Sequence, residues 1–506
     1  MRLAFPLVAA MLATCGSSSS PGAPARSGTA PAGSGGVLEA HGGPRRDGVY
    51  VDATLTTAAA AAFHVDPSFQ AFIAGPIYAQ PLYVPGAGGR DLVVATTERD
   101  DVAAFDAASG AVVWKRHLGD PVPLSKLPCG NIDPLGVTGT PIVDGAGRTL
   151  YVDAMTTPDG GATKQHLVYA LSVDDGSTRP GWPVSVAEVA TRRGLAFDDA
   201  LQNQRGALAL VAGTLYVPFG GHYGDCGDYH GWIFAIPVAS PSAATAWTTR
   251  ARGGGIWAPG GVSSDGSEVF ASTGNTFGAS SWQDGEAVLG FVAGAPLGAS
   301  PADSFAPSNW QELDAGDVDI GGTAPVVVDV PGATPSALVV ALGKDGKIYL
   351  LDRRHLGGIG GQLAVAQVSG GEIINAAAAY TTARGTYVVF KGSGEGCPGG
   401  QSGDLTAVRI APGAPPSATV AWCARQNGTG SPIVTTTDGH ADAVVWSVGA
   451  EGDGRLHGFD GDTGQVVYGG GGAQDALGDV ARFQSPILAA GRIFVATSAG
   501  VKAFRR

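Results

Sequence analysis

The stretch from His222 to His230, HYGDCGDYH, concentrates side chains that could do chemistry. His222, Asp225, Asp228 and His230 carry nitrogen and oxygen atoms of the kind that bind metal ions. The alternative is an ordinary loop, because a stretch this rich in Gly and Asp favours turns. The run Asp460–Gly464 resembles the start of a calcium loop but lacks the distal bidentate Glu, and a turn between strands explains it. Neither a nucleophile motif nor a phosphate-binding glycine loop stands out.

The N-terminus predicts export. Arg2 and the apolar run 3–12 precede Leu12-Ala13-Thr14-Cys15, which resembles a bacterial lipobox; the alternative is an ordinary secretory peptide. We expect a lipoprotein signal peptide over residues 1–15 and a membrane anchor at Cys15. Gly16 is no inner-membrane retention signal, so we predict a periplasmic or cell-surface lipoprotein, at the outer membrane. Residues 16–43, mostly Ser, Gly, Pro and Ala, are predicted to be a disordered linker.

Composition narrows the class of protein. The net charge of −13 leaves no basic surface to neutralise phosphates, which excludes nucleic acid as a partner. Apolar residues make up 44% of the chain and fall in short alternating runs, while the 80 glycines punctuate the turns between them. The chain is therefore predicted to be all-β.

The stretch from Asp91 to Gly119 predicts three short antiparallel strands joined by tight turns. The same pattern returns from Leu167, Trp232, Lys347, Arg455 and, shortened, Gly491. A small sheet repeated at this spacing can bury its faces only by stacking around a common axis. We therefore predict a single β-propeller over residues 44–506, and we expect a monomer.

We predict eight blades. Residues 69–75 match the last strand of a blade, whereas the repeat near 483–504 lacks such a strand, so the N-terminal strand should complete the eighth blade and close the ring. Seven blades is the alternative, because the strand patterns of blades four and six are weak. The predicted blade starts are Tyr78, Val137, Arg205, Ile256, Gly322, Ile373, Gly430 and Phe483.

Besides Cys15, the chain has four cysteines, which allow three disulfide connectivities in an oxidising compartment. We favour Cys129 with Cys226 and Cys397 with Cys423, because each pair would join neighbouring blades or strands of one blade. The alternative is four buried free thiols.

Five long insertions separate predicted strands. Insertions of this length usually cluster on one face of a propeller and build a site or a lid, although they could be decorations. We expect this face to bind a protein or polysaccharide partner. The insertions are 120–135, 192–203, 221–230, 276–286 and 301–319.

The repeat 102–114, VAAFDAASGAVVW, resembles the repeat of the pyrroloquinoline quinone (PQQ) propellers, and the resemblance covers residues 48–506. That superfamily contains the alcohol and glucose quinoprotein dehydrogenases and also non-catalytic relatives, such as an outer-membrane assembly lipoprotein. The resemblance implies the fold and leaves the activity open.

A finer resemblance lies in GIWAPGGVSSDGSEVFASTGN, where Trp257 and Asn275 stand 18 residues apart. It implies that Trp257 lies under the cofactor rings and that Asn275 ligates calcium, since a planar quinone needs an aromatic surface and a hard cation needs oxygen ligands. Lys344 in GKDGKIYLLDR resembles the basic residue at the quinone oxygens. NWQELDAGDVD resembles the segment that supplies the catalytic base, here Asp314 or Asp317. Each of these residues also has a simpler interpretation. Trp257 could be a docking tryptophan between blades, Asn275 and Lys344 turn residues, and Asp314 and Asp317 solvated loop acids.

The departures from the dehydrogenases are also informative. Where they carry a glutamate calcium ligand, this chain has Cys226 between Asp225 and Asp228, which would then join Asn275 at the metal. Where they carry two adjacent cysteines and an arginine for the cofactor's carboxylates, it has a single cysteine, Cys129, and a leucine. A disulfide between the two cysteines would fill the space of the ligand and of the ring cap.

These departures favour an exported, lipid-anchored binding or assembly scaffold with a degenerate quinone pocket and no cofactor. The alternative is a dehydrogenase that uses PQQ and Ca²⁺ to oxidise an alcohol or a sugar.

Overall fold

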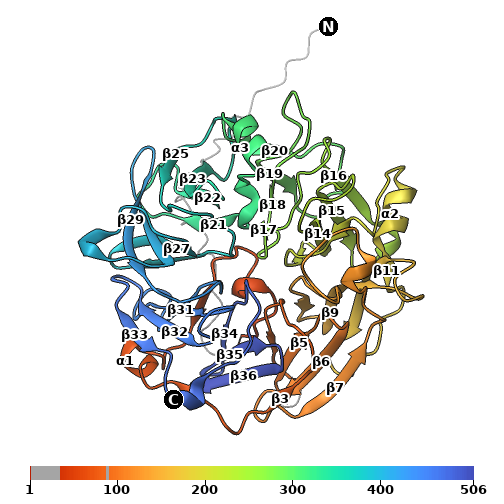
Figure 1. The fold of residues 1–506 in the computed structure, drawn as a ribbon. Coiled ribbons are helices and arrows are strands. Elements are labelled where there is room, and N and C mark those ends of the chain that lie inside the picture. The colour runs from red at the N-terminus through yellow and green to blue at the C-terminus, as the bar shows by residue number, and fades with distance from the viewer. Residues whose placement is uncertain (2–34, 87–89) are drawn as a thin grey trace. The chain divides into compact units, whose positions relative to one another are not determined.

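The computed structural model describes Met1, residues 35–86 and residues 90–506. Within the unit Ala32–Arg506, eight small sheets are arranged radially around one axis (Figure 1). This is the predicted eight-bladed β-propeller, and each predicted blade start falls a few residues before an innermost strand. The seven-blade alternative is wrong. The predicted signal-peptide cleavage region, Cys15 and the linker up to residue 34 lie outside the described residues.

The strands of the first four blades follow the chain. They are, for blade one, β4 (Leu82–Val84), β5 (Leu92–Thr96), β6 (Asp101–Asp106) and β7 (Val112–His117); for blade two, β8 (Ile142–Asp144), β9 (Thr149–Thr156), β10 (Gln165–Ser172) and β11 (Val184–Ser185); for blade three, β12 (Gln202–Asn203), β13 (Ala209–Val211), β14 (Thr214–Gly221), β15 (Trp232–Pro237) and β16 (Thr245–Thr248); and for blade four, β17 (Ser263–Ser264), β18 (Glu268–Thr273), β19 (Ala287–Val292), β20 (Asp303–Ala306) and the added β24 (Gly358–Ile359).

The last four blades include three strands from the N-terminal region. They are, for blade five, β21 (Val326–Asp329), β22 (Ala337–Leu342), β23 (Lys347–Asp352) and β25 (Ala364–Gln367); for blade six, β26 (Ala378–Thr382), β27 (Gly385–Lys391), β28 (Leu405–Ala411) and β29 (Ser417–Ala424); for blade seven, β1 (Val49–Val51), β30 (Ile433–Thr436), β31 (Val444–Val448), β32 (Leu456–Asp460) and β33 (Val466–Gly469); and for blade eight, β2 (His64–Val65), β3 (Ala71–Phe72), β34 (Ile487–Ala489), β35 (Arg492–Thr497) and β36 (Gly500–Arg505).

Helices are short and lie outside the sheets. Those of the described chain are α1 (Thr57–Ala60), α2 (Val186–Arg192) and α3 (Trp310–Gly316), with single 3₁₀ turns at η1 (Ala40–Gly42), η2 (Leu124–Lys126), η3 (Pro241–Ala243), η4 (Ile320–Gly322), η5 (Pro398–Gly400) and η6 (Ala473–Asp475). Within residues 35–86 and 90–506, no helix has the length and apolar character needed to cross a membrane.

The blade strands are apolar on both faces because neighbouring blades cover both sides. All five residues of β5 are buried, as are the four central residues of β6. The tryptophan that ends the repeat docks one blade onto the next. Trp114 donates its indole N–H to the carbonyl of Val173 at 2.6 Å, and Gly176 (φ +72°) lies against its ring, where a Cβ would approach within 2.7 Å. Trp422 repeats this contact on Gly464. At both contacts, the turn of the following blade therefore needs a glycine where the tryptophan ring packs.

The N-terminal region closes the ring. β3, inside the predicted closing segment 69–75, pairs with β36 through Ala71 opposite Val501. β2, which the sequence did not predict, pairs with the far end of β36. The ring of Phe69 packs edge-on against Phe494, with 5.4 Å between centroids. The edge of the last blade is thus covered by β2 and β3.

An axial segment, residues 37–51, runs through the centre of the ring, so the folded unit begins before residue 44. Its backbone carbonyls accept hydrogen bonds from the inner strands of five blades, namely blades two, four, five, six and seven. These pairs join Leu38 to Val143, Pro44 to Ser264, Arg45 to Val327, Asp47 to Ala379 and Gly48 to Val434, at 2.7–3.0 Å. Val37 pairs with Tyr83 of blade one, and His41 with Ser485 of blade eight. Arg46 donates to Leu208 of blade three, which completes contacts with all eight blades.

Arg46 is the buried centre of this segment, with 1% of its surface exposed. Its guanidinium donates to the carbonyls of Val262 and Leu208 on two blades and to Ala40 within the segment. It also forms an ion pair with Glu39 at 3.0 Å. Every face of the cation therefore has an oxygen acceptor, which compensates its burial.

We predict that Arg46→Ala lowers the free energy of unfolding by about 3–5 kcal/mol, because it leaves a carboxylate and several carbonyls without a buried partner. The measurement is urea denaturation followed by tryptophan fluorescence. The adjacent Arg45→Ala is the control: its ion pair with Asp329 is 38% and 48% exposed, so we expect a cost below about 1 kcal/mol. Equal costs for the two variants would contradict the role of the axial segment.

Candidate functional site

The predicted insertions gather on one face. Residues 221–230 join β14 to β15 and residues 276–286 join β18 to β19, while the other three run from the outer part of one blade toward the inner strand of the next. Because strands alternate in direction, these two kinds of connection emerge on the same side of the ring. We call this side the loop face.

Both predicted disulfides are present. Cys129, in the insertion that leads into blade two, is bonded to Cys226 in blade three. Cys397 is bonded to Cys423 within blade six. The first bridge links two insertions of the loop face, and the second links the connection between β27 and β28 to strand β29 of the same sheet.

Lys344 lies at the centre of the candidate site. Its ammonium Nζ is 2.7 Å from Oδ1 of Asp317, 2.9 Å from Oδ2 of Asp319 and 5.4 Å from the centroid of the Trp257 ring. Trp257 precedes the inner strand of blade four, and Lys344 is in the turn between β22 and β23 of blade five. Residues 87 positions apart in the sequence therefore meet between two blades. Trp257 is partly exposed, unlike the docking tryptophan Trp422, which is 1% exposed.

The Thr-Gly-Asn run packs against the same group. The backbone N–H of Asn275 donates to Oδ1 of Asp319 at 2.7 Å. A Cβ on Gly274 would lie 2.9 Å from that oxygen and 3.0 Å from the Trp257 indole nitrogen, so only glycine lets the three groups approach this closely. Asn275 is 6% exposed.

The sequence analysis missed Asp319, although it ends the acidic segment that was singled out. Asp317 is a left-handed cap of α3 (φ +52°) with 63% of its side chain exposed, whereas the Asp319 side chain is 3% exposed. The signal was its position directly before Ile320-Gly-Gly, where the chain turns into the core before β21. The buried acid of this segment is therefore Asp319.

Glu286 is a second buried acid that the sequence did not indicate. One carboxyl oxygen accepts from the backbone N–H of Ile320 at 2.8 Å, and the other has no hydrogen-bond partner among the described residues. Burial, together with the nearby Asp319 carboxylate, raises the pKa of Glu286 well above its usual value. Glu286 therefore stays protonated to higher pH than an exposed glutamate.

Burial and the mutual attraction of the charged groups both shift the pKa values of Lys344 and Asp319. Burial alone would lower the pKa of Lys344, but the carboxylates of Asp319 and Asp317 raise it above its ordinary value. Burial raises the pKa of Asp319 even though Lys344 opposes this. The site thus holds a permanently charged ammonium beside a carboxylate that is more basic than usual.

Asp314 lies on α3 and accepts hydrogen bonds from the backbone N–H and the hydroxyl of Thr276, at 2.8 and 2.6 Å. It faces an open pocket of about 470 Å³ on the loop face. The lining includes Asp225, Asn275, Phe277, Gln311, Asp314 and Asp317. Four of the predicted site residues, Asp225, Asn275, Asp314 and Asp317, therefore line one pocket, whereas Trp257 and Lys344 lie outside its lining.

The predicted metal residues separate into two groups. Asp225 lines this pocket and accepts from the Tyr229 hydroxyl at 2.7 Å, whereas Asp228 is exposed and does not line it. The histidine rings of the same loop bond to backbone carbonyls, His222 to Ala200 and His230 to Thr249. In residues 35–86 and 90–506, no three His, Cys, Asp or Glu side chains are grouped as a metal site would require.

No protein-family model matches this chain, and no curated protein sequence does. Solved structures do. A quinohemoprotein alcohol dehydrogenase, ADHIIG, from Pseudomonas putida HK5 has a TM-score of 0.63 at 12% identity, covering 94% of this chain and 80% of the other. The corresponding enzyme from Comamonas testosteroni has a TM-score of 0.59 at 14% identity, with coverages of 93% and 80%. A europium-containing methanol dehydrogenase has a TM-score of 0.58 at 13% identity, and the match covers 92% of this chain and 89% of the other.

These likenesses concern the fold. The chain has the propeller architecture of the quinoprotein alcohol and methanol dehydrogenases. At 12–14% identity, the fold alone does not carry the activity over to this chain. What the site can do has to be argued from its own residues.

We predict that Lys344→Met lowers the free energy of unfolding at pH 8 by about 3–5 kcal/mol, because Asp319 loses its buried counter-ion. Without the lysine, the folded-state pKa of Asp319 rises further above its unfolded value. The carboxyl then favours folding at low pH, and this contribution is lost as the pH rises through the folded pKa. The deficit should therefore shrink at pH 5, as measured by urea denaturation at both pH values.

The double variant Lys344→Met/Asp319→Asn should recover most of the loss at pH 8. Lys347→Met, whose ion pair with Asp345 is longer at 3.3 Å and whose side chain is 32% exposed, is the matched control and should cost less than about 1 kcal/mol. A deficit that does not change with pH would contradict the assignment of the ion pair.

Proposed function

We propose that the loop face carries a quinone-dependent oxidation site that acts on an alcohol or a sugar. The observation that supports it best is the buried group of Lys344, Asp319 and Trp257 beside an open pocket. A retained buried ion pair costs desolvation, and a carboxylate with a raised pKa next to a cleft is characteristic of a working acid or base.

The Cys129–Cys226 bridge stands where the dehydrogenases have a calcium ligand and a ring cap, so the fit to PQQ with calcium rests on the chemistry of the remaining residues. The partly exposed indole of Trp257 offers an aromatic surface, and Lys344 beside it offers a cation for quinone oxygens. The Asn275 amide and the Asp225 carboxylate, which line one pocket, are oxygen ligands suited to a hard cation. When bound, the quinone would supply the acceptor for two electrons from the substrate.

The chain's own side chains would orient the substrate and move its proton. Asp319 is held in place by the N–H of Asn275 and by Lys344, and burial raises the pKa of its carboxyl, which suits a proton acceptor. Asp319 would therefore accept the hydroxyl proton of the substrate. Asp314, bound twice by Thr276, would shape the pocket wall.

The test is reconstitution of the purified protein with PQQ and Ca²⁺. We expect quenching of tryptophan fluorescence by PQQ, weakened in Trp257→Leu, and reduction of an electron-accepting dye with a panel of alcohols and sugars. Asp319→Asn should lower the rate by about 100-fold or more while keeping the quenching, and Asp314→Asn should change the rate far less. Full activity in Asp319→Asn, or no quenching and no dye reduction in the wild type, would contradict the proposal.

A second candidate function is a binding scaffold without redox chemistry. The supporting observation is Tyr223, which is 67% exposed on the loop that the Cys129–Cys226 bridge fixes in place. Exposed aromatic side chains on rigid loops are frequent anchors for protein and carbohydrate partners. If reconstitution fails, calorimetry with a panel of soluble polysaccharides should detect binding that Tyr223→Ala weakens at least about 10-fold, and no such binding would contradict this candidate.

Both candidates share the proposal that the protein is exported and anchored to the outer membrane at Cys15, since the lipobox-like sequence precedes the folded unit. Either activity would then be exercised outside the cytoplasm.

A further inference from the structure

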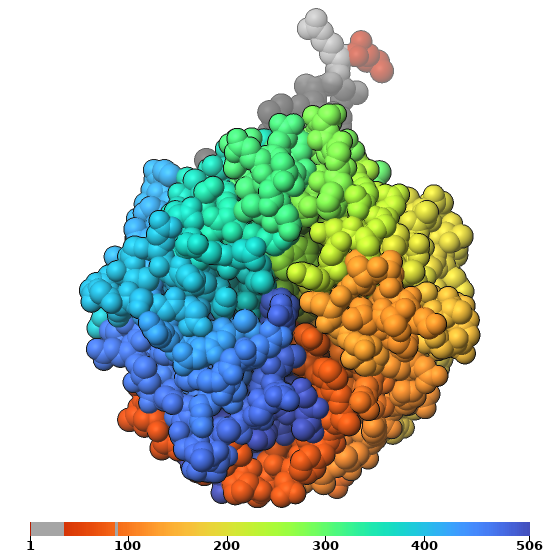
Figure 2. Space-filling view, viewed as in Figure 1, coloured from red at the N-terminus to blue at the C-terminus, as the bar shows by residue number. Residues whose placement is uncertain are grey.

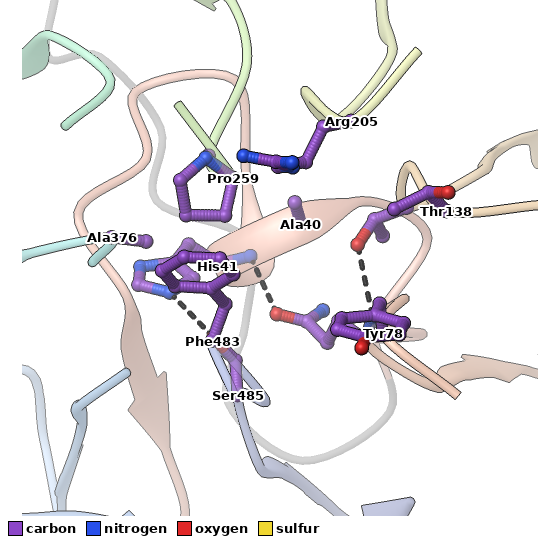
Figure 3. Close-up of a pocket in the computed structure, with 12 residues that line it drawn as sticks. Ala40, His41, Tyr78, Thr138, Arg205, Pro259, Ala376, Phe483 and Ser485 are labelled. Atoms are coloured by element: carbon purple, nitrogen blue, oxygen red, sulfur yellow. Dashed lines mark hydrogen bonds between the residues drawn. The ribbon is translucent and has the colours of Figure 1, made fainter. Parts of the chain in front are cut away.

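The space at the centre of the ring is small. A cavity of about 20 Å³ lies between the axial segment and the starts of several blades (Figure 3), where the space-filling view is hollowed (Figure 2). That volume holds about one water molecule. Arg205 lines the cavity, and the Glu98 carboxyl beside it offsets the arginine's charge and interacts with Thr138. A larger ligand therefore needs the open pocket of about 470 Å³ on the loop face.

The acids around this open pocket differ in whether a cation faces them. Asp317 and Asp319 form ion pairs with Lys344 at 2.7 and 2.9 Å. Asp314, which is partly buried, forms no ion pair with any residue that the structure describes, and neither does Asp225 on another part of the wall. Burial raises the pKa of the Asp314 carboxyl, and hydrogen bonds rather than a cation oppose this. The negative charge of Asp314 is therefore left without a counter-ion beside an open pocket.

Phe277 gives the same pocket an aromatic wall. Its partly exposed ring is covered by Arg252, whose guanidinium lies 4.2 Å from the ring centroid. The guanidinium also donates to the carbonyls of Gly227 and Asp225 at 2.6 and 2.8 Å. The disulfide of Cys226 holds the same loop. The ring is thus fixed by its neighbours, and it offers an apolar surface to the carbon skeleton of a ligand.

Asn275 contributes an amide without a protein partner. It is 6% exposed and lines the pocket. Its backbone N–H and carbonyl are bonded to Asp319 and Gly254, but its side-chain amide forms no hydrogen bond with the described residues. A polar side chain buried this far normally has a partner. The free amide is therefore an observation, independent of the charges, that points to a ligand in this pocket.

The positions of Asp314 and Asp319 limit the length of that ligand. Two consecutive backbone N–H groups, those of Thr276 and Asn275, bind them at 2.8 and 2.7 Å. Because neighbouring Cα atoms are about 3.8 Å apart, the two carboxylates lie within roughly 9 Å of each other. A hydroxyl at Asp319, the proton acceptor proposed above, and a cationic group at Asp314 can therefore belong to one small molecule.

We propose that this pocket binds a small alcohol that carries an ammonium group, such as an amino sugar, with the ammonium on Asp314 and the carbon skeleton against Phe277. A carboxylate without a counter-ion attracts a cation, and its oxygens can accept hydrogen bonds beyond those from Thr276. In the described chain no three ligating side chains are grouped around Asp314, and an aromatic ring lines the same pocket, so an organic cation suits it better than a metal ion. The inference rests on the proposed function, since it names the substrate of the same site.

The test is calorimetry on the full folded protein with Ca²⁺ and without PQQ, at pH 6.5, where the amines are protonated. Glucosamine is compared with glucose and N-acetylglucosamine, and 3-aminopropan-1-ol with propan-1-ol, so that each comparison changes the charge of one substituent. We expect at least one amine to bind about 10-fold or more tightly than its neutral partners, and the difference to shrink at high salt. If neither amine binds more tightly than its neutral partners, the proposal is wrong.

Two variants separate a specific contact from general attraction. Asp314→Asn should lower the affinity for the amine at least about 10-fold and leave the affinity for the neutral partner unchanged. Glu312→Gln, which removes a charge from an exposed side chain of the same helix outside the pocket lining, is the matched control and should bind like the wild type. Equal losses in the two variants would overturn the proposal, and the comparison of amines in the wild type stands on its own if Asp314→Asn is unstable.

The outcome is distinguishable from that of the proposed oxidation. No step of the binding test needs the quinone, so a failure to reduce the dye would leave the binding result standing. Dye reduction with neutral alcohols and no preference for the amines would contradict this inference alone.

Discussion

Closure of the ring is the constraint on which the rest of this structure depends. Each blade buries its two faces only against its neighbours, so an open ring would expose two apolar sheet faces and one strand edge. β2 and β3 remove that edge by pairing with β36, and the axial segment ties the inner strands together from within. The stacking of neighbouring blades brings their connections to one face, and there blades four and five bring Trp257 and Lys344 together.

The buried cations inside the ring have two kinds of surroundings. Arg46 is surrounded by acceptors, which is how a structural cation is stabilised in a protein core. Lys344 is compensated by acids as well, yet it lies beside a cleft and an aromatic ring. Apolar residues would fill this place at lower cost, so we interpret the Lys344 group as a site for a ligand rather than as a support of the fold.

Much of this could be predicted from the sequence, because repeated strand and turn patterns determine how blades stack and which cysteines become neighbours. The nearness of Trp257 and Lys344 followed from a resemblance in two short motifs. The axial segment could not be predicted, since it directly follows a stretch rich in Ser, Gly, Pro and Ala that is typical of a linker, and its contacts are mostly made by backbone carbonyls. Asp319 was missed because only burial in the fold distinguishes it from Asp317 two residues away.

The ligand site that we propose on the loop face of the closed propeller consists of Lys344, Asp319 and Trp257. A crystal structure determined after soaking with PQQ and Ca²⁺ tests it most directly. We expect electron density for the quinone against the Trp257 ring, with Lys344 Nζ within hydrogen-bonding distance of a quinone oxygen. Clear density for Lys344 still closed on Asp317 and Asp319, with the quinone absent or bound elsewhere, would contradict the claim.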